Sequence, residues 1–455
     1  MNLRRKNAAE GESGSATRAA IRAVLRIALP LALAELGWMA MGVVDILMVG
    51  RLPDSAVAIG GASLGNAIFF GIAVFGIGLM SGLDTLVSHA FGAGDMRDGR
   101  RSLAGGIGLA LGASASLALA IYAALPVLGL LQVTPEVRGQ AEVYIRMLLW
   151  SLTPLLLYTV FRRYLQGIHF VRPVPFVLVT ANLVNLAGNW LFVFGHGPFP
   201  AMGLKGSALA TLCARIYLAG CLLAAVKWRD RAAFGEFRPD WARMVQLIRL
   251  GLPAAMSVAF EVGVFCVVTA LVGTLGAVSL AAHTVALNAA SLSYTVPLGI
   301  SSAAAVSVGR AVGAGDRRGA ARAGWMAIGL VVAWEVMTSV CLLVLPRQIA
   351  GAYTSDDRVI SFAVTLLGIA ALFQVGDGLQ VVATGALRGL GNTRTPMVWN
   401  LVGYWGIGLP LGYWLCFERG LGARGLWYGL CAALLLIGIG LAGVWRRAAG
   451  SGVNT

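Results

Sequence analysis

Long apolar runs follow one another along almost the whole chain, and within each run the apolar residues are continuous rather than alternating. A transmembrane helix needs about 20 mostly apolar residues, whereas the strands of a membrane barrel alternate apolar and polar positions. The pattern therefore predicts an all-α integral membrane protein. Short connections rich in Gly, Pro and Asp separate twelve predicted spans, at about 27–49, 60–90, 103–131, 141–161, 174–195, 203–226, 248–272, 277–309, 323–350, 359–387, 397–417 and 425–445.

The composition supports this interpretation. Of the 455 residues, 58% are hydrophobic and only 12% are charged, with a mean hydropathy of +0.79, whereas a typical soluble domain has about 25% charged residues. So little charge argues against a soluble enzyme, a disordered protein and a disulfide-rich secreted domain. The six cysteines lie in or at the ends of spans without metal-ligand spacing, so we expect small buried apolar residues rather than disulfides.

The basic residues are distributed unevenly between the loops. If both termini lie on one side of the membrane, that side carries 26 of the 35 Lys and Arg residues. The positive-inside rule then places both termini in the cytoplasm. Topology thus explains the net charge of +15, and no nucleic-acid partner is predicted. Residues 1–26 are read as a cytoplasmic segment, because the apolar run after them is too long for a signal peptide.

An internal repeat divides the chain into two halves. The sequence Gly-Ala-Gly-Asp occurs at 92–95 and again at 313–316, and Leu29-Pro30 returns as Leu252-Pro253. Because each copy has an even number of spans, the two copies run in the same direction, as in parallel-repeat transporters. We therefore predict two six-helix lobes around a central cleft that serves alternating access. The predicted parts are an N-lobe at 27–226, a cytoplasmic linker at 227–247, a C-lobe at 248–447 and a cytoplasmic tail at 448–455.

Six acidic residues fall within the predicted spans. An unpaired carboxylate at the centre of a bilayer costs about 3 kcal/mol or more, and few basic residues lie in the spans to pair with these acids. Burial favours the neutral form of a carboxyl group, so exchange of H+ or Na+ near neutral pH is accessible. These acids should face water, bind a cation or carry a proton. They are Glu35, Asp45, Asp84, Glu261, Glu335 and Asp377.

Depth in the membrane selects the strongest candidates for cation coupling. Glu261 and Asp377 lie near the middle of their spans, and Asp45 lies about two-thirds of the way across. Asn185 and Asn189 are four residues apart and so share one helix face. With Asp45 they provide the oxygen ligands that a hard cation prefers, although interhelical hydrogen bonding is an equal alternative for the asparagine pair. The predicted sites are Asp45 with both asparagines, and Glu261 with Asp377.

Other polar residues are weaker candidates. His283 can be read as a proton carrier or, more often for a lone histidine, as a packing residue. Asp84 lies near a cytoplasmic turn, where capping or pairing with Arg97, Arg100 or Arg101 is expected. No motif surrounds Glu35 or Glu335. The four histidines are scattered, so no catalytic or metal cluster is predicted and the chain is not expected to be an enzyme. No cofactor is expected, and no metal beyond a transient Na+.

Several short strings of the sequence resemble the multidrug and toxic compound extrusion (MATE) family, in its NorM-type bacterial branch. The resemblance covers about 25–445 and six strings in matching order. They are Val-Val-Asp45-Ile-Leu-Met-Val-Gly, the doubled Gly-Ala-Gly turn, Asn185-Leu-Ala-Gly-Asn189-Trp, Phe260-Glu261-Val, Ala-Ala-His283-Thr-Val-Ala-Leu-Asn288, and Asp377-Gly-Leu-Gln-Val-Val-Ala-Thr-Gly-Ala-Leu-Arg-Gly.

The resemblance implies an antiporter that exports amphipathic, mostly cationic drugs and is driven by entry of Na+ or H+. Family members place cation-binding acids at positions matching Asp45, Glu261 and Asp377, and amides at those matching Asn185 and Asn189. An acidic cavity rich in aromatic residues and Met suits such small organic cations.

Three further positions bear on the resemblance. Asn288 and Phe373 are secondary site candidates, and at Phe373 a Na+-linked member carries Tyr, so the missing hydroxyl favours H+. His89 stands where Gln is common. The alternative is a flippase for a lipid-linked sugar from the same superfamily, which needs Arg or Lys in its cleft where these spans carry acids. A monomer surrounded by membrane lipid is the expected state.

Overall fold

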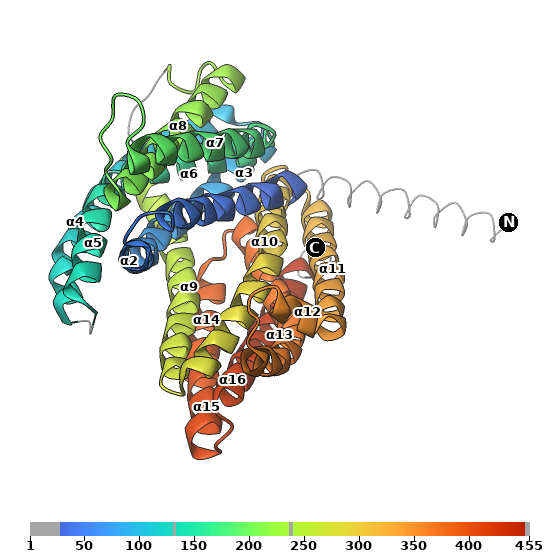
Figure 1. Ribbon diagram of the computed structural model, residues 1–455. Coiled ribbons are helices and arrows are strands. Elements are labelled where there is room, and N and C mark those ends of the chain that lie inside the picture. The colour runs from blue at the N-terminus through green and yellow to red at the C-terminus, as the bar shows by residue number, and fades with distance from the viewer. Residues whose placement is uncertain (1–27, 131–132, 236–239, 451–455) are drawn as a thin grey trace. The chain divides into compact units, whose positions relative to one another are not determined.

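The computed structural model describes residues 28–130, 133–235 and 240–450, and within these ranges every regular element is helical (Figure 1). The predicted segment 1–26 and residues 451–455 of the predicted tail lie outside the described residues. The first described helix is Ala28–Val49. The next elements are α2 (Ser55–Leu79), α3 (Gly82–Gly92), α4 (Met96–Ala124), a 3-10 turn (Leu125–Leu130), α5 (Pro135–Leu149), α6 (Leu152–Gly167), α7 (Pro173–Phe194), α8 (Leu204–Arg229) and α9 (Trp241–Gly273).

The second half of the chain continues in the same way. Its elements are α10 (Ala277–Gly313), α11 (Arg317–Val344), α12 (Pro346–Gly351), α13 (Asp357–Gly389), α14 (Arg394–Asn400), a π-helical segment (Leu401–Gly408), α15 (Leu409–Tyr413), a second π-helical segment (Trp414–Glu418) and α16 (Ala423–Gly450).

The helices confirm the predicted multi-pass membrane architecture. Ten helices within the described ranges are long and apolar enough to cross a membrane, and the pair α5 and α6, bent by 48°, gives an eleventh span. The predicted span at 397–417 corresponds to the uninterrupted helical run from α14 to Glu418. Its α-helical geometry is broken by π-helical turns around Pro410, because proline has no N–H and its ring displaces the carbonyl one turn earlier.

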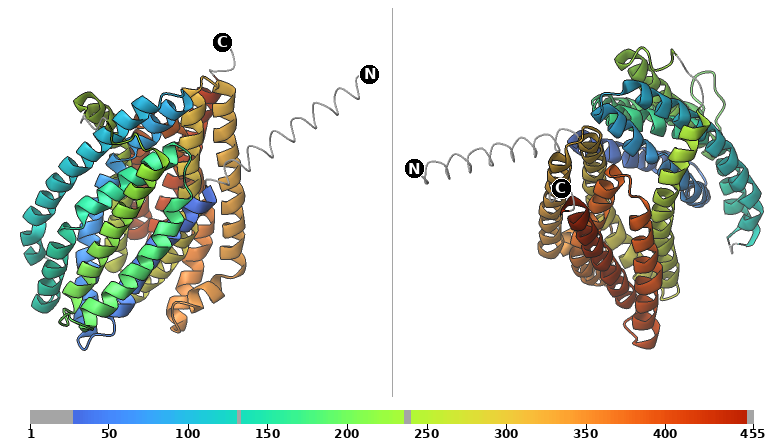
Figure 2. Two further views of the ribbon diagram at one scale, coloured as in Figure 1. Left: turned by 90° about the horizontal axis from the view of Figure 1, so that it is seen from above. Right: turned by 180° about the vertical axis from the view of Figure 1, so that it is seen from behind.

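The chain forms two compact units. The N-terminal unit comprises Leu33–Ala259, and the C-terminal unit comprises Phe260 onwards together with the residues up to Ala32. In the N-terminal unit α7 packs along α8, α2 along α5, and α6 along both α4 and α8 (Figure 2). Gly251 brings α9 against the end of α2, where a Cβ atom would lie 1.9 Å from the carbonyl oxygen of Leu79.

Helix α13 is the central element of the C-terminal unit, with α10, α11 and α16 packed around it (Figure 1). Small residues allow these helices to approach closely. A Cβ atom on Gly438 of α16 would lie 2.6 Å from the carbonyl oxygen of Gly376 on α13, and one on Gly385 would lie 2.3 Å from that of Ser301 on α10. Asp377 therefore lies on a helix that is enclosed on several sides.

The doubled Gly-Ala-Gly-Asp motif forms the same turn in both halves. Gly94 and Gly315 adopt left-handed φ angles of +76° and +74°, a conformation that glycine adopts without strain. The aspartate N–H that follows donates to the carbonyl five residues earlier, at 2.9 and 2.8 Å, which ends α3 and α10 in a Schellman motif. The carboxylates of Asp95 and Asp316 then cap α4 and α11. The motif is therefore a helix-turn-helix connector and not a ligand site.

Asp230, directly after α8, forms hydrogen bonds that connect the end of α8 to α4 and α6 in the N-terminal unit. Arg100 Nε donates to Asp230 Oδ2 at 2.9 Å and its Nη2 to Oδ1 at 2.7 Å, while the Tyr164 hydroxyl donates to Oδ2 at 2.8 Å. Partial burial opposes ionisation of Asp230, but the bonds from Arg100 and Tyr164 outweigh it, so the pKa of the Asp230 carboxyl is lowered from its ordinary 3.8. The ionised group therefore contributes stability above that pH, and the contribution is lost as the pH falls through the lowered pKa.

We expect Asp230→Asn to destabilise the protein by about 2 kcal/mol near neutral pH, because it removes charge-assisted hydrogen bonds. Thermal unfolding of the purified protein in detergent measures this. The difference between the two proteins should shrink below about pH 4. Glu136→Gln, at an exposed position of α5, is the matched control, and a constant difference at all pH values would contradict this account.

Candidate functional site

Asp45 is the centre of a polar cluster in the N-terminal unit. Its side chain is largely buried, with an exposed fraction of 9%. Asn185 Nδ2 and Asn189 Nδ2 donate to Asp45 Oδ1 at 3.0 and 2.7 Å, and the Thr211 hydroxyl donates to Oδ2 at 2.9 Å. The structure thus brings together the three predicted residues from the first helix and α7, and adds Thr211 from α8.

The two amides contact the Asp45 carboxylate through their N–H groups, so they compensate its negative charge as donors. The remaining oxygen, Asn189 Oδ1, is buried and has no hydrogen-bond partner among the described residues. Arg215, one turn after Thr211, is also buried; its charge acts on Asp45, and its guanidinium lies 4.9 Å from the centre of the Phe69 ring. The three donors and the charge of Arg215 thus offset part of the cost of burying the Asp45 carboxylate.

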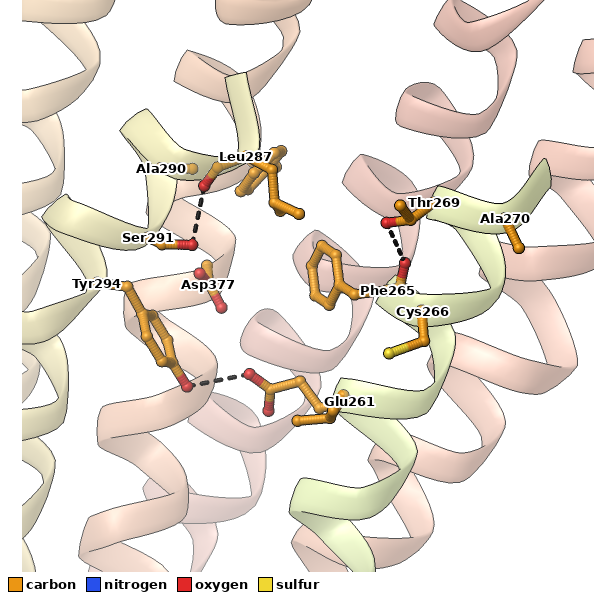
Figure 3. A pocket seen from close by; sticks show the side chains of 12 residues that line it. Glu261, Phe265, Cys266, Thr269, Ala270, Leu287, Ala290, Ser291, Tyr294 and Asp377 are labelled. Carbon is orange, nitrogen blue, oxygen red and sulfur yellow. Dashed lines mark hydrogen bonds between the residues drawn. The ribbon is translucent and has the colours of Figure 1, made fainter. Parts of the chain in front are cut away.

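A cavity of about 560 Å³ lies within the C-terminal unit, between α9, α10 and α13 (Figure 3). Its walls are mostly apolar and aromatic, and two of the predicted acids face it. The lining residues are Glu261, Val262, Phe265, Cys266, Thr269, Ala270, Leu287, Ala290, Ser291, Tyr294, Phe373 and Asp377.

Hydrogen bonds hold Glu261 in place at one side of this cavity. The Tyr294 hydroxyl donates to Glu261 Oε1 at 3.0 Å (Figure 3), and Gln380 Nε2 donates to Oε2 at 3.1 Å. The Gln380 orientation is itself fixed, because the buried Tyr404 hydroxyl donates to Gln380 Oε1 at 2.8 Å. Both oxygens of Glu261 therefore have a neutral donor, and no Lys or Arg of the described residues pairs with the carboxylate.

Asp377 has no such support. It is 9% exposed, and it makes no hydrogen bond or ion pair with any described residue. None of the lining residues is Lys or Arg, and no ion pair with Glu261 occurs in the described ranges either. An uncompensated carboxylate in an apolar environment is costly unless a cation or a proton neutralises it. The described residues of the cavity thus leave the charge of an ionised Asp377 uncompensated.

His283 is fully buried and bonded at both ring nitrogens. Trp427 Nε1 lies 3.0 Å from His283 Nδ1, and Thr269 Oγ1 lies 2.9 Å from Nε2. An indole N–H can only donate, so Nδ1 must accept and the ring is held in its neutral Nε2–H form. The geometry favours the packing interpretation of His283, since it links α10 to α16 and to the cavity wall at Thr269.

The other two secondary candidates, Phe373 and Asn288, form no hydrogen bond with Glu261 or Asp377. Phe373 lines the cavity and packs against Trp427, with ring centres 5.4 Å apart, and it offers no oxygen ligand. Asn288 is exposed on α10 and does not line the cavity.

Two of the remaining intramembrane acids belong to ion pairs in the N-terminal unit. Glu35 pairs with Arg162, and Asp84 pairs with Arg163 at 2.7 Å. These pairs indicate structural roles for both acids.

Three residues of the two clusters were not among the sequence candidates, namely Thr211, Tyr294 and Gln380. Gln380 carried a usable signal, because it lies three residues after Asp377 and so shares its helix face. The hydroxyls of Thr211 and Tyr294 carried none, since both residues occur commonly inside membrane helices.

Comparison with known proteins identifies relatives along the whole chain. The family model described as MatE matches residues 30–191 and again residues 253–414. The two matches begin 223 residues apart, which is the offset of the Leu-Pro repeat in the sequence and confirms the duplication.

Curated relatives and solved structures agree with this match. The chain is 38% identical over 444 residues to a probable multidrug resistance protein NorM of Mesorhizobium japonicum, covering 94% of each chain. It is also 38% identical to the multidrug resistance protein NorM of Burkholderia vietnamiensis, covering 92% of each. A crystal structure of a eukaryotic MATE transporter matches with a TM-score of 0.86 at 20% identity, covering 96% of this chain and 98% of that one. An outward-facing multidrug resistance MATE family transporter of the MOP superfamily matches with a TM-score of 0.83 at 19% identity, covering 96% and 97%.

The neutral state of His283 leads to a test. Gln can accept from Trp427 and donate to Thr269 as the histidine does, so we expect His283→Gln to keep the parental pH dependence of transport between pH 6 and 8. Trp427→Phe, which removes the indole donor and leaves a gap in a buried site, should lower the unfolding free energy by about 2 kcal/mol or more. A pH profile altered by His283→Gln would show that the ring carries protons.

Proposed function

Because the chain belongs to the MATE family, in its NorM-type branch, we propose that it exports amphipathic, mostly cationic drugs and toxic organic compounds across the bacterial inner membrane. Export would be coupled to the entry of H+ or Na+. The observation that carries the proposal is the pair Glu261 and Asp377 in an apolar cavity without a basic partner. Relatives at 38% identity that are named multidrug resistance proteins support the same conclusion.

The cavity in the C-terminal unit suits the coupling cation. Glu261 is held by neutral donors, and Asp377 offers a carboxylate with no competing partner. When a cation enters from outside, it would neutralise this pair. Neutralisation lowers the energy of the transporter state in which the acids are buried, so the cation would favour that state over the other. It would also weaken the binding of a cationic drug, because the negative charge that attracts the drug is removed. Only such a difference in affinity between states can drive transport.

Asp45 with Asn185, Asn189 and Thr211 would form the coupling site of the N-terminal unit. The three donors and the nearby Arg215 stabilise the ionised carboxylate. This site would therefore release its cation more easily than the pair in the C-terminal unit. Differences of this kind let one protein take up a cation on one side and give it up on the other.

We favour H+ as the coupling ion. Na+ binding requires several oxygen ligands around the ion. In the cavity Phe373 lacks the hydroxyl that a tyrosine would supply beside Asp377. A proton needs only one acceptor, which Asp377 provides.

The proposal includes the topology and the assembly state. Both termini would be cytoplasmic, since that orientation places 26 of the 35 basic residues inside. A monomer would contain the whole transport unit, because the duplication supplies both halves within one chain. A flippase for a lipid-linked sugar is disfavoured, because a pyrophosphate would meet two acids and no basic residue in the cavity.

Loss of either acid of the C-terminal unit should abolish coupled export. We expect Asp377→Asn and Glu261→Gln each to reduce efflux of ethidium-like dyes from cells by about 10-fold or more, with normal amounts of protein in the membrane. Glu142→Gln, on α5 of the other unit, is the control. If both variants exported the dye at the parental rate, the proposed mechanism would be wrong.

The identity of the ion can be measured in proteoliposomes with an imposed pH gradient, an imposed Na+ gradient, or both. We expect the pH gradient alone to drive uptake of dye, and the Na+ gradient alone to drive little. Phe373→Tyr adds one hydroxyl near Asp377, so it should raise the response to Na+. A parental protein that responds only to Na+ would overturn our choice of H+.

A further inference from the structure

A third carboxyl group lies inside the C-terminal unit and takes no part in the coupling site described above. Glu335 of α11 has an exposed fraction of 1%. One of its oxygens, Oε2, accepts hydrogen bonds from the hydroxyls of Thr338 at 2.8 Å and Ser293 at 3.3 Å. The other, Oε1, receives no hydrogen bond from the described residues. A buried carboxyl bonded by two neutral hydroxyls at one oxygen is suited to carrying a proton.

Gly378, the residue after Asp377 on α13, provides the space that the Glu335 side chain occupies. A Cβ atom on Gly378 would lie 2.5 Å from Glu335 Cγ and 3.0 Å from Oε1. Any larger residue at 378 would thus displace the Glu335 side chain. The residue whose backbone makes room for Glu335 is the immediate neighbour of the proposed cation-binding aspartate on α13.

A short chain of hydrogen bonds joins Glu335 to α10 and α13. Ser293, which donates to Glu335, accepts a bond from Gln374 Nε2 at 2.5 Å. Gln374 lies one helical turn before Asp377 on α13, and Ser293 immediately precedes Tyr294 on α10. A change of charge or position at Glu335 therefore reaches α10 and α13, the helices that carry Tyr294 and Asp377.

No basic residue forms an ion pair with Glu335 or lowers the cost of its ionisation among the described residues. The ionisable groups that act on it are Asp377 of α13 and Tyr294 of α10, and none of the ion pairs within the described ranges includes Glu335. Two carboxyl groups in one apolar region oppose each other's ionisation, so their protons are bound and released as a linked pair.

We propose that Glu335 is a second proton-binding residue of the C-terminal unit, whose protonation is linked to that of Asp377. The inference rests on the proposed cation coupling and deepens it. While Asp377 is ionised, Glu335 keeps its proton; when a cation neutralises Asp377, Glu335 can release that proton to water and later regain it. No bond other than the O–H bond of the carboxyl forms or breaks.

The first test is transport by Glu335→Gln in proteoliposomes. Removing the carboxyl that exchanges its proton in step with Asp377 should shift the pH profile of dye transport by about half a unit or more. The number of protons exchanged per dye molecule, obtained from the reversal potential, should rise, because no proton then leaves residue 335 when one binds at Asp377. Glu335→Asp, which retains the carboxyl, should keep a profile close to the parental one. An unchanged profile and an unchanged proton number in a folded Glu335→Gln protein would overturn the proposal.

The second test does not depend on transport. Infrared difference spectra of the purified parental protein, recorded during a pH titration, should contain a carboxylic-acid C=O band that is missing in Glu335→Gln and present in Glu136→Gln. Gly378→Ala, which crowds the carboxyl, should shift the same band. If the parental protein exported no dye but the band titrated, the proposed function would fail and this inference would stand. If the parental protein exported dye but no band were lost in Glu335→Gln, the inference alone would be wrong.

Discussion

The C-terminal unit buries carboxyl groups in an apolar interior without a basic side chain to pair with them, and its other features follow from this constraint. Glu261 and Glu335 are each stabilised by neutral donors, and Asp377 by none within the described ranges. Neutral hydrogen bonds offset part of the cost of burying a carboxylate but leave its charge in place. Only a visiting cation or a proton removes the remaining cost. The interior is therefore stable in one state of charge and strained in another.

In the N-terminal unit, arginine side chains lie near the buried carboxylates. Arg162 pairs with Glu35, Arg163 pairs with Asp84, and Arg215 lies on the helix that also presents Thr211 to Asp45. A buried carboxylate beside an arginine can stay ionised in every state, and its partner then becomes essential. The two halves thus share helix order and turn geometry while their electrostatics differ, so duplication fixed the scaffold and left the charges free to diverge.

The membrane limits what the sequence can predict. The spans could be predicted because a transmembrane helix needs about 20 apolar residues in a row. Asp45, Glu261 and Asp377 could be predicted because charged residues are rare in such runs. The hydrogen-bond donors to these acids could not be predicted, because a threonine or tyrosine in a membrane helix has many alternative roles. The partner of Glu35 lies 127 residues away in the chain, and Pro410 predicts a disturbed helix without showing that the disturbance takes the form of π-helical turns. Long-range pairing and local helix geometry carry no periodic signal.

The asymmetry between the two acidic clusters explains why one chain keeps both. Asp45 has three donors on its carboxylate, so binding a proton there must break or rearrange hydrogen bonds and gains little. Asp377 has none, so binding a proton there removes an uncompensated charge and loses nothing. A cation that reached both would be held more strongly in the C-terminal unit, at the helix that α10, α11 and α16 enclose. Glycines at 376 and 378 are what let those neighbours come so close on either side of Asp377. Any larger residue at 376 or 378 would push the neighbouring helices apart and admit water to the Asp377 carboxylate. The energy of the fold would then depend less on the charge of Asp377. Coupled transport requires that dependence, because the cation must favour one conformation over the other.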